Sequence, residues 1–167
     1  MKKKLNQTKS NQISSITLYS SIIILILLDL LTKTFFTNKF YGNGFIFIQY
    51  IQNLGSSFGI FSNVNLYSTL ILILSIIVLI IIIYKKEHFL TNKYLTFVFV
   101  FFVAGIIGNS YDRLFFGFVR DFIGLKHLFI FNLADLYFSI AFILFMIPEL
   151  SDTKNLKSKK MKKYHGK

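Results

Sequence analysis

The chain has 167 residues, of which 54% are hydrophobic, and a formal net charge of +12. So much apolar surface exceeds what a water-soluble globule of this length can bury, which excludes a soluble protein and indicates an integral membrane protein. Cysteine is absent and the three histidines stand far apart, which excludes thiol catalysis, disulfides and thiolate metal sites and predicts no bound metal.

The first apolar stretch runs from Ile16 to Phe36 and has the roughly 20 residues that a helix needs to cross the hydrocarbon core. Lysines at positions 2–4 precede it, so a cleavable signal peptide is an alternative. A signal peptide has a shorter apolar core followed by a small-residue cleavage site, whereas this stretch becomes apolar again at Phe35. We therefore expect a retained membrane helix.

Three further apolar stretches follow, at residues 66–84, 94–111 and 129–150. Each reaches the length of a span, so the predicted fold is an all-α membrane protein with four transmembrane helices in one domain, residues 1–150. The segment between the first two spans is long for a simple loop. Within it, residues 45–51 form a short apolar run after a turn, which predicts a strand.

The positive charges indicate which loops face the cytoplasm. Of the 19 Lys and Arg residues, four precede the first span, three lie between residues 85 and 93, and seven follow Leu150. The positive-inside bias predicts that these regions, both termini included, are cytoplasmic and that segments 37–65 and 112–128 face outward. The basic tail, residues 151–167, is expected to contact anionic membrane lipids and not nucleic acid.

Ionisable residues inside a membrane are costly unless they are paired, so their positions are informative. From a rise of about 1.5 Å per residue, Asp29, Asp112 and Asp135 all lie near the outer ends of their helices, and Asn132 shares a helix face with Asp135. Asp121 precedes Asp135 by 14 residues, a separation that a loop can fold back across. Two carboxylates brought together hold one proton between them, as the general acid and base of aspartic proteases do.

The other charged residues near this end are interpreted as structural. Asp29 and Lys33 are four residues apart with the acid first, which favours an ion pair within the helix. Asp112 lies near a helix C-terminus, where the helix dipole disfavours an acid. We expect Arg113 or Arg120 to compensate it, and we interpret Arg113 as mainly architectural.

Four sequence blocks stand out in order along the chain: DLLTK at 29–33, NLGSSFG at 53–59, GNSYDRLFFGFVRDF at 108–122 and FNLAD at 131–135. Together they resemble the bacterial lipoprotein signal peptidases, also called signal peptidase II. The family usually has a Gly-Gly pair where this chain has Ala104 and Gly105, a departure that bears on packing and not on chemistry. Ala104 and Gly108 are four apart, which permits close helix approach.

The resemblance implies an intramembrane aspartic endopeptidase that removes signal peptides from diacylglyceryl-modified prolipoproteins, cutting just before the lipidated cysteine without a cofactor. It implies that Asp121 and Asp135 are the catalytic residues. It also implies a bacterial cytoplasmic membrane location, an active site near the extracytoplasmic face and a small amphipathic sheet beside it; we expect a monomer. Substrate-binding or supporting roles are implied for Asn53, Gly55, Asn109, Asp112, Arg113 and Asn132.

Three alternatives stay open on the sequence alone. An ion-coupled transporter would use the intramembrane acids as a relay, but it predicts acids across the full membrane depth and inverted repeats, and the sequence shows neither. A structural subunit leaves the gathering of polar groups at one end unexplained. A Ser/Lys protease would use Lys33 as the base and Ser56, Ser57 or Ser110 as the nucleophile, and no sequence feature pairs any of these serines with Lys33.

Overall fold

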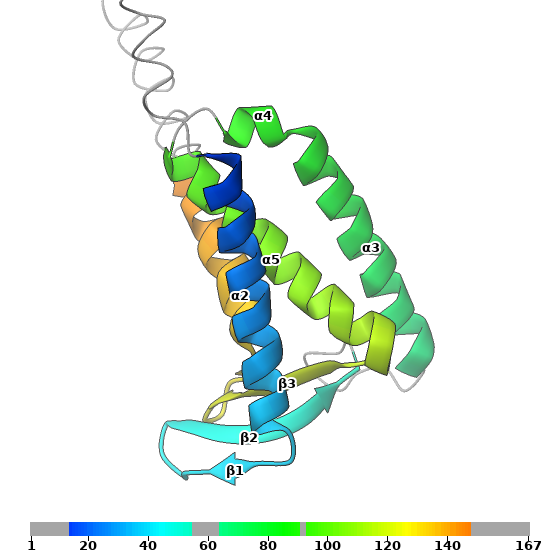
Figure 1. The fold of residues 1–167 in the computed structure, drawn as a ribbon. Helices are drawn as coiled ribbons and strands as arrows, with labels where there is room; N and C mark the ends of the chain where they lie inside the picture. The colour runs from blue at the N-terminus through cyan, green and yellow to red at the C-terminus, as the bar shows by residue number, and fades with distance from the viewer. Residues whose placement is uncertain (1–13, 55–63, 91–92, 148–167) are drawn as a thin grey trace, which may run out of the picture.

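The computed structural model describes residues 14–54, 64–90 and 93–147, and Figure 1 shows long helices that meet a small sheet at one end. The helices are α2 (Ser15–Phe36), α3 (Val64–Tyr84), α4 (Lys86–Phe89), α5 (Lys93–Phe116) and a last helix, Leu133–Ile147. The strands are β1 (Phe40–Tyr41), β2 (Ile46–Asn53), β3 (Val119–Leu125) and β4 (Ile130–Phe131). The described part is therefore mostly helical with one small sheet.

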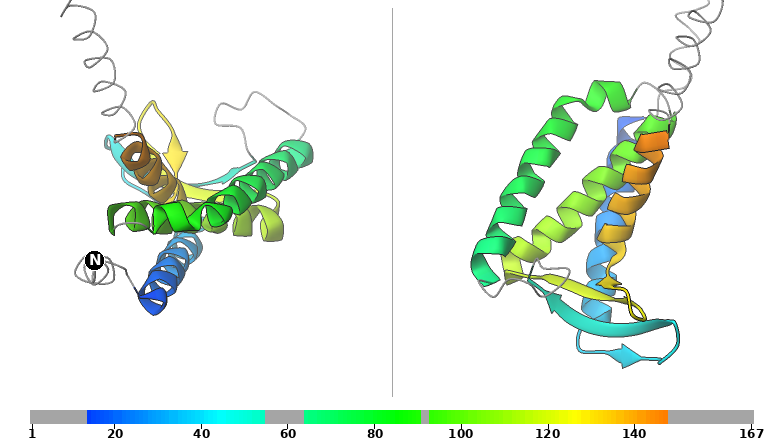
Figure 2. Two further views of the ribbon diagram at one scale, coloured as in Figure 1. Left: turned by 90° about the horizontal axis from the view of Figure 1, so that it is seen from above. Right: turned by 180° about the vertical axis from the view of Figure 1, so that it is seen from behind.

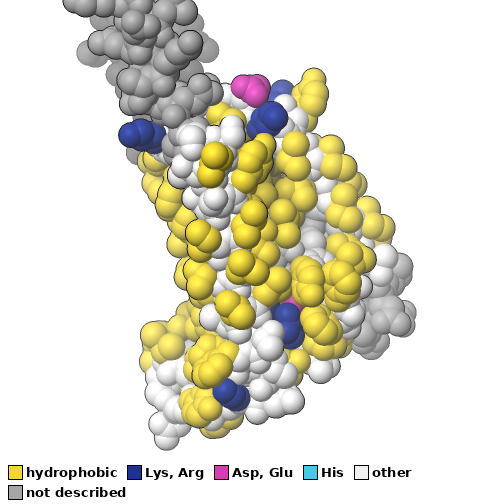
Figure 3. All heavy atoms as spheres, in the orientation of Figure 1, with side chains coloured by type: hydrophobic (Ala, Val, Ile, Leu, Met, Phe, Trp, Pro, Cys, Tyr) yellow, Lys and Arg dark blue, Asp and Glu magenta, His cyan; other side chains and the backbone are white. Residues whose placement is uncertain are grey.

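The helices expose large apolar side chains to their surroundings. Ile16 is 80% exposed and Leu31 is 65% exposed, and Figure 3 shows apolar side chains over much of the face that α2 and α3 present. The hydrocarbon of a bilayer covers such side chains without the penalty that water imposes. In the described residues, α2 and α5 are long and apolar enough to cross a membrane, while the apolar stretches Ser68–Tyr84 and Leu133–Ile147 are shorter. The count of four spans stays a prediction.

Helix α5 is the central helix. Figure 2 shows it between α2 and the last helix, with α3 inclined beside it. The buried apolar core lies toward the ends of the helices that are remote from the sheet, as its members show: Leu18, Ile22, Ile82, Phe89, Val98, Phe99, Val100, Phe102, Val103, Ile106 and Ala141. Apolar packing therefore stabilises the end of the helices that is remote from the sheet. The polar side chains gather at the sheet end.

Small residues let α5 approach its two neighbours closely. A Cβ atom on Gly105 would lie 2.6 Å from the Ala134 carbonyl oxygen, and one on Gly108 would lie 2.6 Å from Asp29 Oδ2. Side chains do not approach so closely, so only glycine fits at both positions. The predicted close approach at Gly108 is thus confirmed, Gly105 adds a second, and Ala104 is fully buried.

The sheet has the strand order β1-β2-β3-β4, and all neighbouring strands are antiparallel. The strand predicted at residues 45–51 is confirmed as β2. A register shift in β2 precedes the pairs that matter for the site, Ile51 with Asp121 and Asn53 with Val119. Side chains alternate along a strand, so Asn53 and Asp121 lie on the same face of the sheet.

Helix α5 extends beyond Tyr111, the predicted end of the third span, and continues to Phe116. Gly117 then takes a left-handed conformation, with φ at 78°. Its N–H donates to the Arg113 carbonyl oxygen at 3.1 Å, which satisfies one of the last carbonyls of the helix. Asp112 therefore lies one turn before the end of α5, and Arg113 lies in its last turn.

The last helix begins later than Phe129, the predicted start of the fourth span. Residues 130–131 form β4, and the helix begins only at Leu133. Hydropathy alone does not distinguish an apolar strand from an apolar helix. The continuous apolar run therefore predicted one helix where the structure has β4 followed by the last helix. The predicted end of this span, Leu150, lies outside the described residues.

Candidate active site

The polar residues predicted for the site gather at the sheet end of the helices. They come from segments far apart in sequence that Figure 1 shows converging: the second half of α2, the end of β2, the second half of α5, the start of β3 and the start of the last helix. Gly55 lies outside the described residues. The residues that hydrogen bonds and ion pairs connect are Asp29, Lys33, Asn53, Asn109, Asp112, Arg113, Asp121, Asn132 and Asp135.

Asp121 is a fully buried carboxylate on β3. Its Oδ2 accepts from Asn53 Nδ2 at 2.8 Å, and its Oδ1 accepts from Asn132 Nδ2 at 2.5 Å. Burial, followed by the charge of Asp135, raises the pKa of Asp121 to about 7, and the two amide hydrogen bonds oppose that rise. Near neutral pH this side chain can therefore hold or release a proton.

Asn132 and Asp135 form a reciprocal cap at the start of the last helix. The Asp135 N–H donates to Asn132 Oδ1 at 3.0 Å, and the Asn132 N–H donates to Asp135 Oδ2 at 3.2 Å. This is the pattern of a capping box, with an amide and a carboxylate as the two partners. Because Asn132 also donates to Asp121, it stands between the two carboxylates and ties their positions together.

Asn109 connects this cap to α2. Its Nδ2 donates to Asp135 Oδ1 at 2.6 Å. Its Oδ1 accepts from Lys33 Nζ at 3.0 Å and from Asn132 Nδ2 at 3.1 Å. Each carboxylate oxygen can accept more than one hydrogen bond, so both carboxylates keep acceptor capacity for water or for a shared proton.

Asp29 and Lys33 form a buried ion pair at the predicted spacing, with 2.7 Å between Lys33 Nζ and Asp29 Oδ2. The same ammonium lies 3.5 Å from Asp112 Oδ2. The other oxygen of Asp29 accepts from the Ala134 N–H at 2.9 Å. An anion is favourable at a helix N-terminus, so Asp29 links α2 to the first turn of the last helix.

Asp112 is compensated by Arg120, the second of the two predicted candidates. The Arg120 backbone N–H donates to Asp112 Oδ2 at 2.9 Å, and Nη2 donates to Oδ1 at 2.8 Å. Arg120 also donates from Nη1 to Thr34 Oγ1 at 3.1 Å, and its guanidinium lies over the Phe116 ring. The set of predicted site residues omits Arg120. The alternation of side chains along a strand could have identified Arg120. Neighbouring residues point to opposite faces, so Arg120 faces away from Asp121 and toward the helices.

Arg113 is oriented differently from Arg120. Its Nη1 donates to the Asn109 carbonyl oxygen at 3.5 Å, and its Nε has no partner among the described residues. Arg113 thus brings a positive charge to Asn109, the residue whose side chain donates to Asp135.

The alternative of a Ser/Lys protease finds no support in the described residues. Ser110 Oγ is buried and has no hydrogen-bond partner there, so it is not paired with Lys33. Lys33 Nζ instead contacts the carboxylates of Asp29 and Asp112. Ser56 and Ser57 lie outside the described residues.

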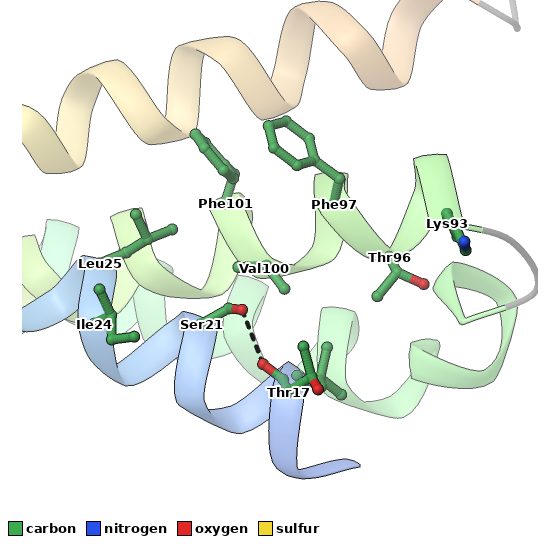
Figure 4. A pocket seen from close by; sticks show the side chains of 10 residues that line it. Thr17, Ser21, Ile24, Leu25, Lys93, Thr96, Phe97, Val100 and Phe101 are labelled. Atoms are coloured by element: carbon green, nitrogen blue, oxygen red, sulfur yellow. Dashed lines mark hydrogen bonds between the residues drawn. The ribbon is translucent and has the colours of Figure 1, made fainter. Parts of the chain in front are cut away.

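Among the described residues, this cluster contains no candidate metal site, and the cavity between α2 and α5 lies apart from it. In the part of the chain that the structure describes, no group of three or more His, Cys, Asp or Glu side chains could hold a metal ion. A cavity between α2 and α5 lies toward the other end of the helices (Figure 4). It is lined by Thr17, Leu18, Ser21, Ile24, Leu25, Lys93, Thr96, Phe97, Val100 and Phe101.

Comparison with known proteins identifies relatives over most of the chain. The family described as Signal peptidase (SPase) II matches residues 21–151. A lipoprotein signal peptidase of Wigglesworthia glossinidia brevipalpis is 34% identical over 152 residues, covering 83% of this chain and 92% of the relative. Another, of Thermodesulfovibrio yellowstonii, is 31% identical over 140 residues, covering 78% of this chain and 92% of the relative.

Solved structures show the same fold. A bacterial membrane enzyme determined by the in meso method at 2.3 Å resolution is 27% identical to this chain, with a TM-score of 0.75, and the match covers 87% of this chain and 94% of that one. A second such structure, at 1.9 Å resolution, has a TM-score of 0.74 with 27% identity, covering 85% of this chain and 97% of that one. The arrangement of helices and sheet is therefore that of a known membrane enzyme.

The buried ion pair leads to a prediction about stability. We expect Asp29→Asn to lower the free energy of unfolding by about 3 kcal/mol, because it leaves the Lys33 charge without its nearest partner. Changing both residues, as Asp29→Asn with Lys33→Met, removes both charges and should restore most of that loss. Denaturant unfolding in detergent micelles measures both effects. A single variant that is as stable as the native protein but inert would assign the pair to the chemistry instead.

Proposed function

The chain belongs to the signal peptidase II family, and on that basis we propose that Asp121 and Asp135 are the catalytic pair with which it cleaves its substrate. Members of this family are proteases that remove signal peptides from prolipoproteins. The bond cut is the peptide bond just before the diacylglyceryl-modified cysteine. The reaction is a hydrolysis, so its substrates are the lipidated precursor and water.

The hydrogen bonds of Asn132 carry this proposal. This residue donates to Asp121 and exchanges two hydrogen bonds with Asp135. It therefore connects the two carboxylates for which the resemblance implies a catalytic role. Among the described residues, Asp121 accepts hydrogen bonds from the side-chain amides of Asn53 and Asn132. Asp135 instead accepts from the backbone at a helix N-terminus, where an anion is favoured. This asymmetry supports different roles for the two.

Asp121 is the general acid and Asp135 the general base. The ionised Asp135 takes a proton from water while the water oxygen bonds to the scissile carbonyl carbon, and Asp121 gives its proton to the carbonyl oxygen. The tetrahedral intermediate then collapses as the C–N bond breaks and a proton passes to the cysteine nitrogen. The products are a signal peptide with a new carboxylate and a lipoprotein with a free α-amine.

The surrounding residues support the pair. Asn53 and Asn109 each donate to one carboxylate, and Arg113 stabilises negative charge near both. Asp112 supports the site through its pairing with Arg120. Gly55 has a substrate-binding or supporting role that rests on the sequence resemblance alone.

The membrane arrangement follows from the charge distribution and the apolar helices. The protein is a single protease domain over residues 1–150 with four spans in the bacterial cytoplasmic membrane, and both termini face the cytoplasm. The sheet and the carboxylates lie at the extracytoplasmic face, and the lipidated substrate enters from the bilayer. The basic tail, residues 151–167, contacts anionic lipids on the opposite side. The protein acts as a monomer.

Either Asp121→Asn or Asp135→Asn should abolish cleavage of a diacylglyceryl-modified prolipoprotein by the purified protein. Asparagine keeps the size and much of the hydrogen bonding but removes the shared titration, so the general acid or the general base is lost. Because the two residues act as one unit, the double variant should be no worse than either single variant by more than about threefold. Near-native turnover by either variant, in a preparation free of native enzyme, would sink the aspartic mechanism.

The rate should also depend on pH through the proton on Asp121. Because the pKa of Asp121 is about 7, its protonated fraction falls as pH rises through that value. We expect kcat/KM to fall about tenfold per pH unit on the alkaline side, with the apparent pKa belonging to the coupled pair. Initial rates between pH 5 and 10, in roughly half-unit steps, measure this limb. A profile that stays flat to pH 9 would remove Asp121 from the acid role.

The proposed topology is tested by reporter fusions. Fusions at Lys39 and Lys126 should report the outside of the cell, because these positions belong to the outward segments. Fusions at Lys86 and Lys160 should report the cytoplasm. Paired reporters with opposite compartment requirements provide the control at each position. An outside signal from the Lys86 fusion would overturn the four-span arrangement.

A further inference from the structure

Lys33 makes more contacts than an ion pair with Asp29 requires. Its side chain has no exposed surface, and Nζ faces oxygens of α2 and α5: Asp29 Oδ2 at 2.7 Å, Asp112 Oδ2 at 3.5 Å and the Gly108 carbonyl at 3.4 Å. The fourth oxygen is Oδ1 of Asn109, at 3.0 Å. That contact links Lys33 to the catalytic pair, since the same amide donates to Asp135.

The donors around Asn109 determine which way its amide points. Lys33 Nζ carries only donor hydrogens, and so does Asn132 Nδ2. The Asn109 atom that faces both must therefore be the acceptor oxygen, because the flipped amide would set donor against donor. The Asn132 amide is itself fixed, since its Nδ2 donates to Asp121 and its Oδ1 accepts from the Asp135 N–H. With the oxygen of Asn109 so held, its Nδ2 is directed to Asp135 Oδ1.

We propose that Lys33 is a positioning residue for the catalytic pair, which acts by holding the Asn109 amide in the orientation that presents Nδ2 to Asp135. This inference rests on the proposed function. It adds a role in turnover to the structural role of the ion pair with Asp29. Lys33 touches neither catalytic carboxylate in this arrangement, and its effect on them passes through one side chain.

The positive charge of Lys33 strengthens the link. An ammonium bound to an amide oxygen polarises the amide, so the N–H at the other end becomes a better donor. The Nδ2 to Oδ1 distance of 2.6 Å between Asn109 and Asp135 is short for a neutral donor. Removing the ammonium leaves the amide held by Asn132 alone, and the base loses the fixed orientation that attack by water requires.

The test must separate positioning from stability. Lys33→Met is introduced together with Asp29→Asn, so that no charge is left unpaired and the protein folds. We expect kcat to fall by up to about 100-fold, the scale on which a small misplacement of reacting groups acts, with KM within about twofold of native. Val98→Ala is the matched control: it opens a buried cavity at the far end of α5, and it should reduce stability without changing kcat.

A double-mutant cycle identifies the route. If Lys33 acts through Asn109, the Asp29→Asn and Lys33→Met changes should lower kcat by less than about twofold in an Asn109→Ala background. A full, multiplicative loss there would overturn the inference, and so would native kcat in the folded Asp29→Asn/Lys33→Met protein. Should that protein fail to fold, Asn109→Ala alone decides: near-native kcat overturns the inference and a loss of similar size supports it. In each of these experiments, loss of cleavage by the Asp121→Asn protein supports the proposed function separately from the role of Lys33.

Discussion

The burial of negative charge is the constraint on which the rest of this structure depends. Asp29, Asp112 and Asp121 have no exposed surface, and a buried carboxylate without partners is unstable. Two of the three are compensated by cations, Asp29 by Lys33 and Asp112 by Arg120 together with Lys33. Asp121 has neutral amides as its hydrogen-bond partners. The type of partner thus separates the two acids that are paired with cations from Asp121.

The same constraint explains why the two ends of the helices are packed differently. Apolar packing around α5 holds the end remote from the sheet, where the described core residues are all apolar. At the sheet end, Gly105 and Gly108 let three helices come close enough for Asp29 to reach the Ala134 N–H.

Much of the site could be predicted from local spacing, and the rest depends on tertiary geometry. The i, i+4 spacing of Asp29 and Lys33 and the i, i+3 spacing of Asn132 and Asp135 are properties of one helix turn, and both pairs are in contact. The partner of Asp112 depends instead on how the chain turns after the helix and on the face of β3 that Arg120 occupies. The contact of Asn53 with Asp121 requires the register of two strands and a bulge, which no periodicity reveals.

The hydrogen bond from Ala134 to Asp29 joins the first described helix of the chain to the last, and it has a consequence for biosynthesis. While the ribosome is still making the last helix, Asp29 lacks this donor and Asp121 lacks Asn132. The earlier helices can insert and pack, but the two carboxylates are not yet connected. In the proposed arrangement, the newborn chain therefore lacks the paired carboxylates of the proposed site until the helix Leu133–Ile147 has been made.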